Sequence, residues 1–173
     1  MFSTKVRDKQ IEDLLATGQL TYEPQVYSVA YCRAMADHLE KLWDKETRTL
    51  LRPLAPDEEQ FIRNELFLCR LSYQHWADRY VKILDFSKQL IYFKHNIAQE
   101  LLLSVISEME EAQEAIMIQL LKLRQLGCSS VVQRIIAWRT LFYSNTDSLV
   151  GSNDPDKTRK LLEDNIGLTY ENL

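Results

Sequence analysis

The segment from Ala115 to Tyr143 constrains the fold of this chain more than any other. It reads AIMIQLLKLRQLGCSSVVQRIIAWRTLFY, which is a short apolar run, a polar loop with one glycine, and an amphipathic stretch. The apolar run is typical of a buried parallel strand, and the amphipathic stretch has the spacing of a helix. A strand, a tight loop and a helix in this order is how a phosphate-binding loop is built.

The loop departs from the usual phosphate-binding pattern, GxxxxGK[ST], at two positions. Lys122 stands in the first glycine slot and Cys128 in the lysine slot, whereas Gly127 and Ser129 match the pattern. A phosphate site needs backbone N–H groups at a helix start, a glycine, a positive charge and a hydroxyl group. Lys122 or Arg124 could supply the charge from elsewhere in the loop. The alternative is an ordinary strand–loop–helix turn with two exposed basic residues.

Residues 1–80 are predicted to form a helical N-terminal region. KQIEDLLATG indicates a short helix stopped by Gly18, and one or two helices are expected before Pro53. A longer helix is predicted for residues 56–80, because Pro56 suits the first helical position and acidic residues follow it. Its apolar stripe is expected to belong to the core and consists of Ile62, Leu66, Cys69, Tyr73, Trp76 and Tyr80.

Residues 81–173 are predicted to be α/β. Two strands are expected on either side of DFSK, then a helix with its apolar face at Ile97, Leu101, Val105 and Met109. AIMIQLL and DSLVGS are predicted strands, and helices are expected after each of them. The alternation of strands and helices along this region predicts the first part of a parallel sheet with flanking helices.

Composition excludes several classes of protein. The net charge of −4 gives no overall basic field that would attract nucleic acid. The three cysteines show no CxxC spacing, which fits a reducing cytoplasm rather than a disulfide or zinc scaffold. His38, His75 and His95 are scattered along the chain, so a histidine-based metal or acid–base cluster is not expected. No apolar run approaches the length needed to span a bilayer.

Several segments resemble a known family in the order in which that family carries them. KLRQLGCSS resembles the deviant Walker A loop of viral large terminases, in which the lysine stands at the start of the loop. LAPDEEQFIRNELFLCRLSYQHWADRYVKIL is similar to the N-terminal segment of many tailed-phage terminases, and NIAQELLL to their adenine-recognition segment. NTDSLVGSNDPDKTRKLLE resembles the strand and helix that follow the Walker A helix. The resemblance covers roughly residues 55–170 and identifies the chain as the N-terminal part of a terminase ATPase domain.

The resemblance implies ATP and Mg²⁺ as cofactors and assigns roles to named residues. Lys122 takes the role of the displaced lysine on the β- and γ-phosphates, and Arg124 acts on the γ-phosphate in catalysis. Ser129 would be a magnesium ligand, and Gln99 would read the adenine edge. The other cofactor-binding residues are Gln125, Gly127, Cys128 and Ser130.

Some of these residues also have purely structural interpretations. Asn96 and Gln99 are also spaced as a capping box, so Gln99 could cap its own helix. Cys128 is interpreted as a small packing residue and not as a nucleophile. Arg134 and Arg139 are expected to lie on a solvated helix face rather than to contact DNA or a partner.

The resemblance also implies what the whole protein would do. It would package double-stranded viral DNA in the host bacterial cytoplasm, with the portal protein, a small terminase subunit and other copies of itself as partners. No apolar strand ending in an acidic pair occurs between Val131 and Leu173. We therefore expect residues 81–173 to be a truncated P-loop ATPase domain without its nuclease, and to hydrolyse ATP slowly or not at all. The alternatives are another P-loop or helicase-like ATPase fragment, or a non-enzymatic helical adaptor.

Overall fold

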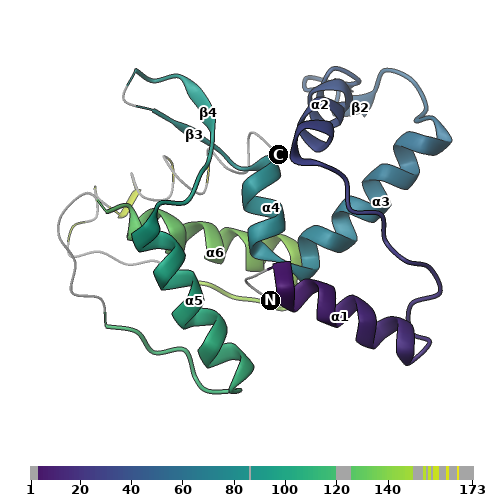
Figure 1. Cartoon of the computed structure of the whole chain (residues 1–173). Helices are drawn as coiled ribbons and strands as arrows, with labels where there is room; N and C mark the ends of the chain where they lie inside the picture. The colour runs from purple at the N-terminus through teal and green to yellow at the C-terminus, as the bar shows by residue number, and fades with distance from the viewer. Residues whose placement is uncertain are drawn as a thin grey trace.

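The computed structural model describes residues 4–85, 87–119 and 126–149, together with Asp154, Asp156, Thr158, Arg159, Glu163 and Gly167. In chain order the elements are α1 (Thr4–Ala16), α2 (Val29–Glu40), β1 (Trp43–Asp44), β2 (Thr49–Leu50), α3 (Pro56–Leu71), α4 (Tyr73–Tyr80), β3 (Lys82–Leu84), β4 (Leu90–Tyr92), α5 (Ile97–Glu111) and α6 (Cys128–Phe142). Figure 1 shows α4 near the centre of the molecule, with the longer helices around it. The described residues form a mixed α and β fold in which helices dominate.

The start of α3 follows from its sequence. Pro56 is its first residue, and three acidic residues occupy its first turn. Glu58 accepts the backbone N–H of Ala55 at 2.7 Å and two hydrogen bonds from Arg52 at 2.6 and 2.8 Å. The hydrogen bonds from Arg52 are the main reason that the pKa of Glu58 lies well below its usual value. The predicted helix start is therefore confirmed.

The helix predicted for residues 56–80 is two helices. Between α3 and α4, Ser72 adopts an extended backbone with φ −143° and ψ 119°. Its hydroxyl oxygen accepts the N–H of His75 at 3.1 Å, which is the N-cap contact that favours a helix start at a serine. The prediction of one continuous stripe is therefore wrong: Leu66 on α3 is 56% exposed, whereas Trp76 on α4 is buried.

Two antiparallel hairpins supply the strands of the described residues. β3 and β4 pair on either side of DFSK, as predicted, and Asp85 closes their turn by accepting the N–H of Gln89 at 2.8 Å. β1 and β2 form a second hairpin that the sequence did not indicate. Its turn is held by Asp44, whose carboxylate accepts the N–H groups of Glu46 and Thr47 at 2.9 and 3.3 Å.

The described parts of the two predicted parallel strands are not strands. Residues 115–119 of AIMIQLL lie in neither helix nor strand, and Met117 is 84% exposed. Residues 147–149 of DSLVGS are likewise irregular, and the remainder of both segments lies outside the described residues. A strand needs a neighbour that satisfies its backbone groups. In the described ranges, β3 and β4 pair only with each other, and neither of these segments adds a strand to them.

The helix predicted from NIAQELLL is present as α5, but it buries a different face. Ile97 and Leu101 are 85% and 66% exposed, and Val105 is also exposed. The buried residues of α5 lie on the adjacent face and are Gln99, Leu102, Leu103, Ile106 and Ser107. Both faces carry residues at helical spacing, so the spacing predicted the helix correctly but did not determine which face is buried.

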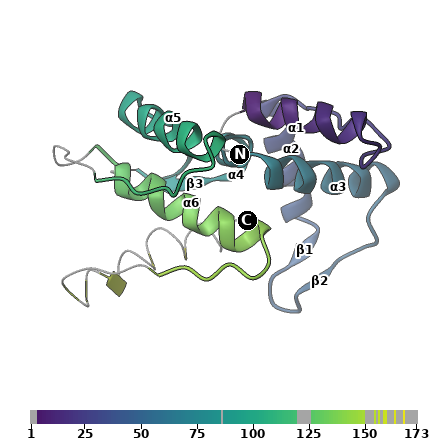
Figure 2. The ribbon, with the colours of Figure 1, turned by 90° about the horizontal axis from the view of Figure 1, so that it is seen from below.

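The main core lies where α4, α5 and α6 meet. Its members come from these helices and the adjoining segments and are Cys69, Tyr73, Trp76, Ala77, Val81, Phe93, Leu102, Leu103, Ile106, Cys128, Val131, Ile135, Ala137 and Trp138. Trp138 anchors α6, because its indole N–H donates to the carbonyl oxygen of Cys69 at 2.7 Å. Figure 2 shows α5 and α6 at one end of the molecule and α1 and α3 at the other. In the described part of the chain, no helix is long and apolar enough to cross a bilayer.

Candidate functional site

Side-chain hydrogen bonds join the start of α5 to the glycine loop before α6. The side-chain amide of Gln99 donates from Nε2 to the carbonyl oxygen of Gly127 at 3.1 Å. Asn96 donates from Nδ2 to the carbonyl oxygen of Leu126 at 3.2 Å. The fold therefore brings the glutamine that was predicted to read adenine against the end of the predicted phosphate loop.

Gln99 also caps its own helix. Its backbone N–H donates to Asn96 Oδ1 at 3.0 Å, and its Oε1 accepts the backbone N–H of Asn96 at 3.0 Å. This reciprocal pair is a capping box, so the capping alternative for Gln99 is confirmed. The side chain is only 4% exposed, and its amide connects the first turn of α5 to the residue that precedes α6.

Gly127 is required at its position for two separate reasons. Its φ of +67° lies in the left-handed region, which other residues adopt only with strain. A Cβ at this position would also lie 2.5 Å from Gln99 Nε2, which is too close for a non-bonded contact of a carbon, so the Gln99 amide would have to move. The glycine thus permits both the turn into α6 and the contact with Gln99.

The first turn of α6 holds the remaining described members of the predicted loop. Cys128 is buried in the main core, as expected of a packing residue. Ser129 is exposed and Ser130 is half-buried. The backbone N–H of Ser130 donates to the carbonyl oxygen of Gly127 at 3.1 Å, which closes the first turn. The exposed serine hydroxyl is therefore at the start of α6, where backbone N–H groups favour an anion.

Arg134 lies one turn further along α6 and is buried, contrary to the predicted solvated face. Its Nη1 donates to the carbonyl oxygen of Ser130 at 2.8 Å, and its guanidinium carbon lies 4.7 Å from the centre of the Phe93 ring. Burial lowers the pKa of Arg134 from its usual value. Arg139 is half-exposed and pairs with Glu110 of α5 at 2.9 Å. No pattern in the sequence indicated that Arg134 is buried, because its partner Phe93 is distant in the chain.

Three residues of the predicted site cannot be placed in this arrangement. Lys122, Arg124 and Gln125 lie outside the described residues. The arrangement that is described therefore consists of Gln99 against Gly127, followed by Cys128, Ser129 and Ser130 in the first turn of α6. The roles of Lys122 and Arg124 in phosphate binding and catalysis stay predictions.

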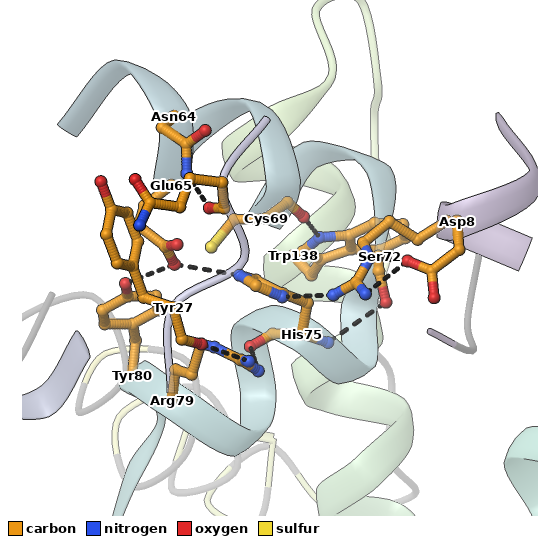
Figure 3. Close-up of polar contacts among 12 residues, drawn as sticks. Asp8, Tyr27, Asn64, Glu65, Cys69, Ser72, His75, Arg79, Tyr80 and Trp138 are labelled. Carbon is orange, nitrogen blue, oxygen red and sulfur yellow. Dashed lines mark hydrogen bonds and ion pairs between the residues drawn. The ribbon is translucent and has the colours of Figure 1, made fainter. Parts of the chain in front are cut away.

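A second polar cluster, which the sequence did not indicate, lies between α1, α3 and α4 (Figure 3). Arg7 Nη1 lies 2.7 Å from His75 Nδ1, and His75 Nε2 lies 2.9 Å from Glu65 Oε2. A guanidinium can only donate, so His75 must accept at Nδ1 and carry its proton on Nε2. Tyr80 donates to the same Glu65 oxygen at 2.6 Å. The histidine is thus neutral and bridges an arginine and a carboxylate.

Burial and hydrogen bonding explain the protonation states in this cluster. Burial lowers the pKa of His75, which keeps the ring neutral. Burial alone would raise the pKa of Glu65, but hydrogen bonds from His75 and Tyr80 outweigh it and leave that pKa lowered. Burial and the hydrogen bond to Glu65 raise the pKa of Tyr80. The cluster therefore holds one ionised carboxylate between two neutral donors.

Glu65, Cys69 and His75 could in principle hold a metal, since their ligand atoms lie within 4.8 Å of one another. The hydrogen bonds argue against this use. Arg7 occupies the Nδ1 lone pair of His75, so Nε2 carries the proton and has no lone pair for a metal. Burial also raises the pKa of Cys69 well above its usual value, so a thiol is present instead of the thiolate that binds metals. These residues fit a structural network and not a metal centre.

Comparisons of the chain with family models, with curated proteins and with solved structures found no match.

Proposed function

We propose that this chain is the ATP-binding N-terminal portion of a large terminase subunit, the motor that packages double-stranded DNA into phage procapsids. The resemblance of residues 55–170 motivates the proposal. One structural observation supports it: Gln99 hydrogen-bonds to Gly127 at 3.1 Å, directly before α6. A residue that reads the base and a loop that holds the phosphates must lie close together to bind one nucleotide, and these two segments do.

In this proposal the loop contributes three kinds of group to Mg²⁺ and ATP. Lys122 and Arg124 supply positive charge to the phosphates, with Arg124 stabilising the charge that develops on the γ-phosphate. Ser129 offers its exposed hydroxyl to Mg²⁺. Backbone N–H groups at the start of α6 and the side chains of Gln125 and Ser130 complete the loop. The reaction is in-line attack of water on the γ-phosphate, accelerated by positioning and charge.

The finer fold and the partners belong to the same proposal. Residues 81–173 would contribute to the first part of a P-loop sheet with flanking helices in the complete subunit. That subunit would act in the host bacterial cytoplasm and would engage DNA, the portal protein, the small terminase subunit and further copies of itself. Gln99 already uses its amide in the cap and in the contact with Gly127. Adenine would therefore have to use the second lone pair of Oε1 and the second N–H of Nε2.

Titration with a fluorescent ATP analogue, mant-ATP, in the presence of Mg²⁺ tests the proposal. We expect saturable binding that Lys122→Ala and Arg124→Ala each weaken about tenfold or more, because a hydrogen bond to a charged group is worth about 1.5–3 kcal/mol. Lys9→Ala and Arg63→Ala are matched controls, since each removes the same charge from an exposed position. These controls should leave the affinity unchanged.

Either of two results would contradict the nucleotide site. One is the absence of any saturable binding by a folded chain. The other is binding that Lys122→Ala and Arg124→Ala affect no more than Lys9→Ala and Arg63→Ala do.

A non-enzymatic helical adaptor is the second candidate, and the exposed apolar face of α5 favours it. Ile97, Leu101 and Val105 follow one another at steps of four residues and are all exposed. An apolar row of this kind is common at surfaces that contact another protein. An adaptor would show no nucleotide affinity in the same titration, which separates the two candidates directly.

A further inference from the structure

The N-terminal helix α1 is attached to the rest of the described fold by few side chains. Figures 1 and 2 show it on the outside of the molecule, beside α3. Among residues 7–16, only Arg7 and Ile11 are buried, and the other side chains are exposed or half-buried. Ile11 supplies an apolar contact, whereas Arg7 is a cation that is only 5% exposed. The attachment of α1 therefore depends strongly on the partner of Arg7.

That partner is a histidine whose protonation state decides whether the contact can form. Arg7 Nη1 lies 2.7 Å from His75 Nδ1, and the His75 side chain is fully buried. The other ring nitrogen donates to Glu65 Oε2 at 2.9 Å. A guanidinium has no acceptor atom, so the hydrogen bond exists only while Nδ1 keeps its lone pair. The contact between α1 and α4 thus requires a neutral ring.

The groups around the ring oppose a proton at Nδ1 while α1 is attached. Burial and the cations Arg79 and Arg7 disfavour the imidazolium, whereas Glu65 favours it. The new N–H would face Arg7 Nη1 across the same 2.7 Å, with both cations largely removed from water. The charged and titratable groups that the three helices bring to the ring are Arg7 and Asp8 of α1, Glu65 and Cys69 of α3, and Arg79 and Tyr80 of α4.

The remaining groups of this set do not relieve the conflict. Asp8 accepts from Arg7 Nε at 2.7 Å, but it is exposed and belongs to α1 itself. Burial raises the pKa values of the Cys69 thiol and the Tyr80 hydroxyl, so both stay neutral. Movement of α1 away from the ring is therefore the direct way to separate the two cations.

We propose that α1 is an acid-released latch: when His75 takes up a proton from solvent at Nδ1, Arg7 loses its acceptor and α1 leaves α3 and α4, while the main core stays folded. Once α1 has left, water reaches the new N–H at Nδ1, and Glu65 remains as the counter-ion at Nε2. The main core contains no residue of α1, so its packing does not depend on the latch. None of the latch residues belongs to the proposed nucleotide site, so the two proposals stand independently.

Hydrogen exchange of backbone amides, followed by mass spectrometry at pH 7.5 and pH 5.5, tests the latch. Each measured rate is divided into the intrinsic exchange rate at the same pH, which gives a protection factor. We expect α1 to be at least about tenfold less protected than α6 at both pH values, because α1 opens while α6 stays folded. A histidine that titrates near pH 6.5 after release should lower the protection of α1 about tenfold between pH 7.5 and pH 5.5.

Two results of this measurement would overturn the latch. One is equal protection of α1 and α6, which would mean that α1 opens only when the whole chain unfolds. The other is protection of α1 that does not fall between pH 7.5 and pH 5.5.

Three variants assign the effect to the contact between Arg7 and His75. His75→Gln should remove the fall in α1 protection between the two pH values, since the ring no longer titrates. Arg7→Met should lower α1 protection at least about tenfold at pH 7.5, because it removes a hydrogen bond from a charged group. Its further fall at pH 5.5 should be smaller than that of the wild type, since no cation faces Nδ1.

Lys9→Met is the matched control, because it removes a cation from an exposed position on the same helix. It should keep both the protection of the wild type and its dependence on pH. An undiminished fall in His75→Gln, or an Arg7→Met variant that behaves like Lys9→Met, would overturn the proposal.

Discussion

At the scale of single residues, a comparison of Gly18 with Gly127 separates the cost of a strained backbone from the cost of losing the contact with Gln99. Gly18 and Gly127 have φ values of +69° and +67°, but a Cβ on Gly18 would meet nothing within 4 Å. We expect Gly18→Ala to lower the free energy of unfolding by about 1 kcal/mol through strain alone. Gly127→Ala should cost about 2 kcal/mol, because it also displaces the Gln99 amide from its hydrogen bonds. Urea denaturation measures both values.

A double variant provides the control for this comparison. Once Gly127→Ala has displaced the amide, adding Gln99→Ala should cost little more, whereas Gln99→Ala alone should be clearly destabilising. Equal costs for Gly18→Ala and Gly127→Ala, or fully additive effects of Gly127→Ala and Gln99→Ala, would contradict the contact.

The lowered pKa of His75 predicts that the protein loses stability in mild acid. An unfolded histidine titrates near pH 6.5, and burial lowers the pKa of His75 in the folded protein. Below about pH 6.5 the unfolded chain therefore takes up a proton that the folded chain does not, so the free energy of unfolding falls as the pH falls. We expect a decline of up to about 1.4 kcal/mol per pH unit between pH 6.5 and the lowered pKa. Urea unfolding at pH 7.5 and pH 5.5 measures it.

Two variants assign this pH dependence to one side chain. His75→Gln should be less stable at pH 7.5 but should lose much less stability between pH 7.5 and pH 5.5. His38→Gln is the comparison variant, because it removes a half-exposed histidine that lies outside the network of Arg7, His75 and Glu65. The same decline in His75→Gln as in the wild type would show that His75 is not its source. The lowered pKa of Glu65 acts at lower pH, below about 4.5, and does not confuse this comparison.

At the scale of elements, α5 offers a direct test of which face is buried. Leu101 is exposed and Leu102 is buried in the main core, although the two are neighbours with the same side chain. Leu101→Glu should change the free energy of unfolding by less than about 0.5 kcal/mol. Leu102→Glu should cost more than about 3 kcal/mol, since it buries a charge without a partner. Thermal denaturation followed by circular dichroism compares the two variants. A larger loss of stability in Leu101→Glu than in Leu102→Glu would mean that α5 buries the face of Leu101.

The elements that the sequence predicted correctly are those with local causes. Pro56 starts α3, and Asn96 and Gln99 cap α5, through contacts that span only a few residues. The break at Ser72 also has a local cause, but the apolar stripe on both sides of it obscured the N-cap. The apolar run at residues 115–119 shows the opposite case, because a strand depends on a neighbour that local sequence does not reveal.

At the scale of the whole molecule, the contacts that sequence could not supply are those between distant segments. Arg7 and His75 are 68 residues apart, and Gln99 and Gly127 are 28 residues apart. The resemblance placed Gln99 and Gly127 in one site, but no pattern indicated the network around His75. Packing of α1, α3 and α4 creates the network, which depends on tertiary contacts rather than on spacing along the chain.

Assigned amide NMR spectra during titration with ATPγS and Mg²⁺ test the central claim most directly. The account predicts that the amide signals of Gly127, Cys128 and Ser129 shift with a single saturation curve, because phosphate oxygens approach their N–H groups. The amides of Trp43 and Tyr92, which line a cavity that neither Gln99 nor Gly127 borders, should stay in place. Unchanged signals at residues 127–129 in a folded chain, or shifts confined to that cavity, would contradict the nucleotide site.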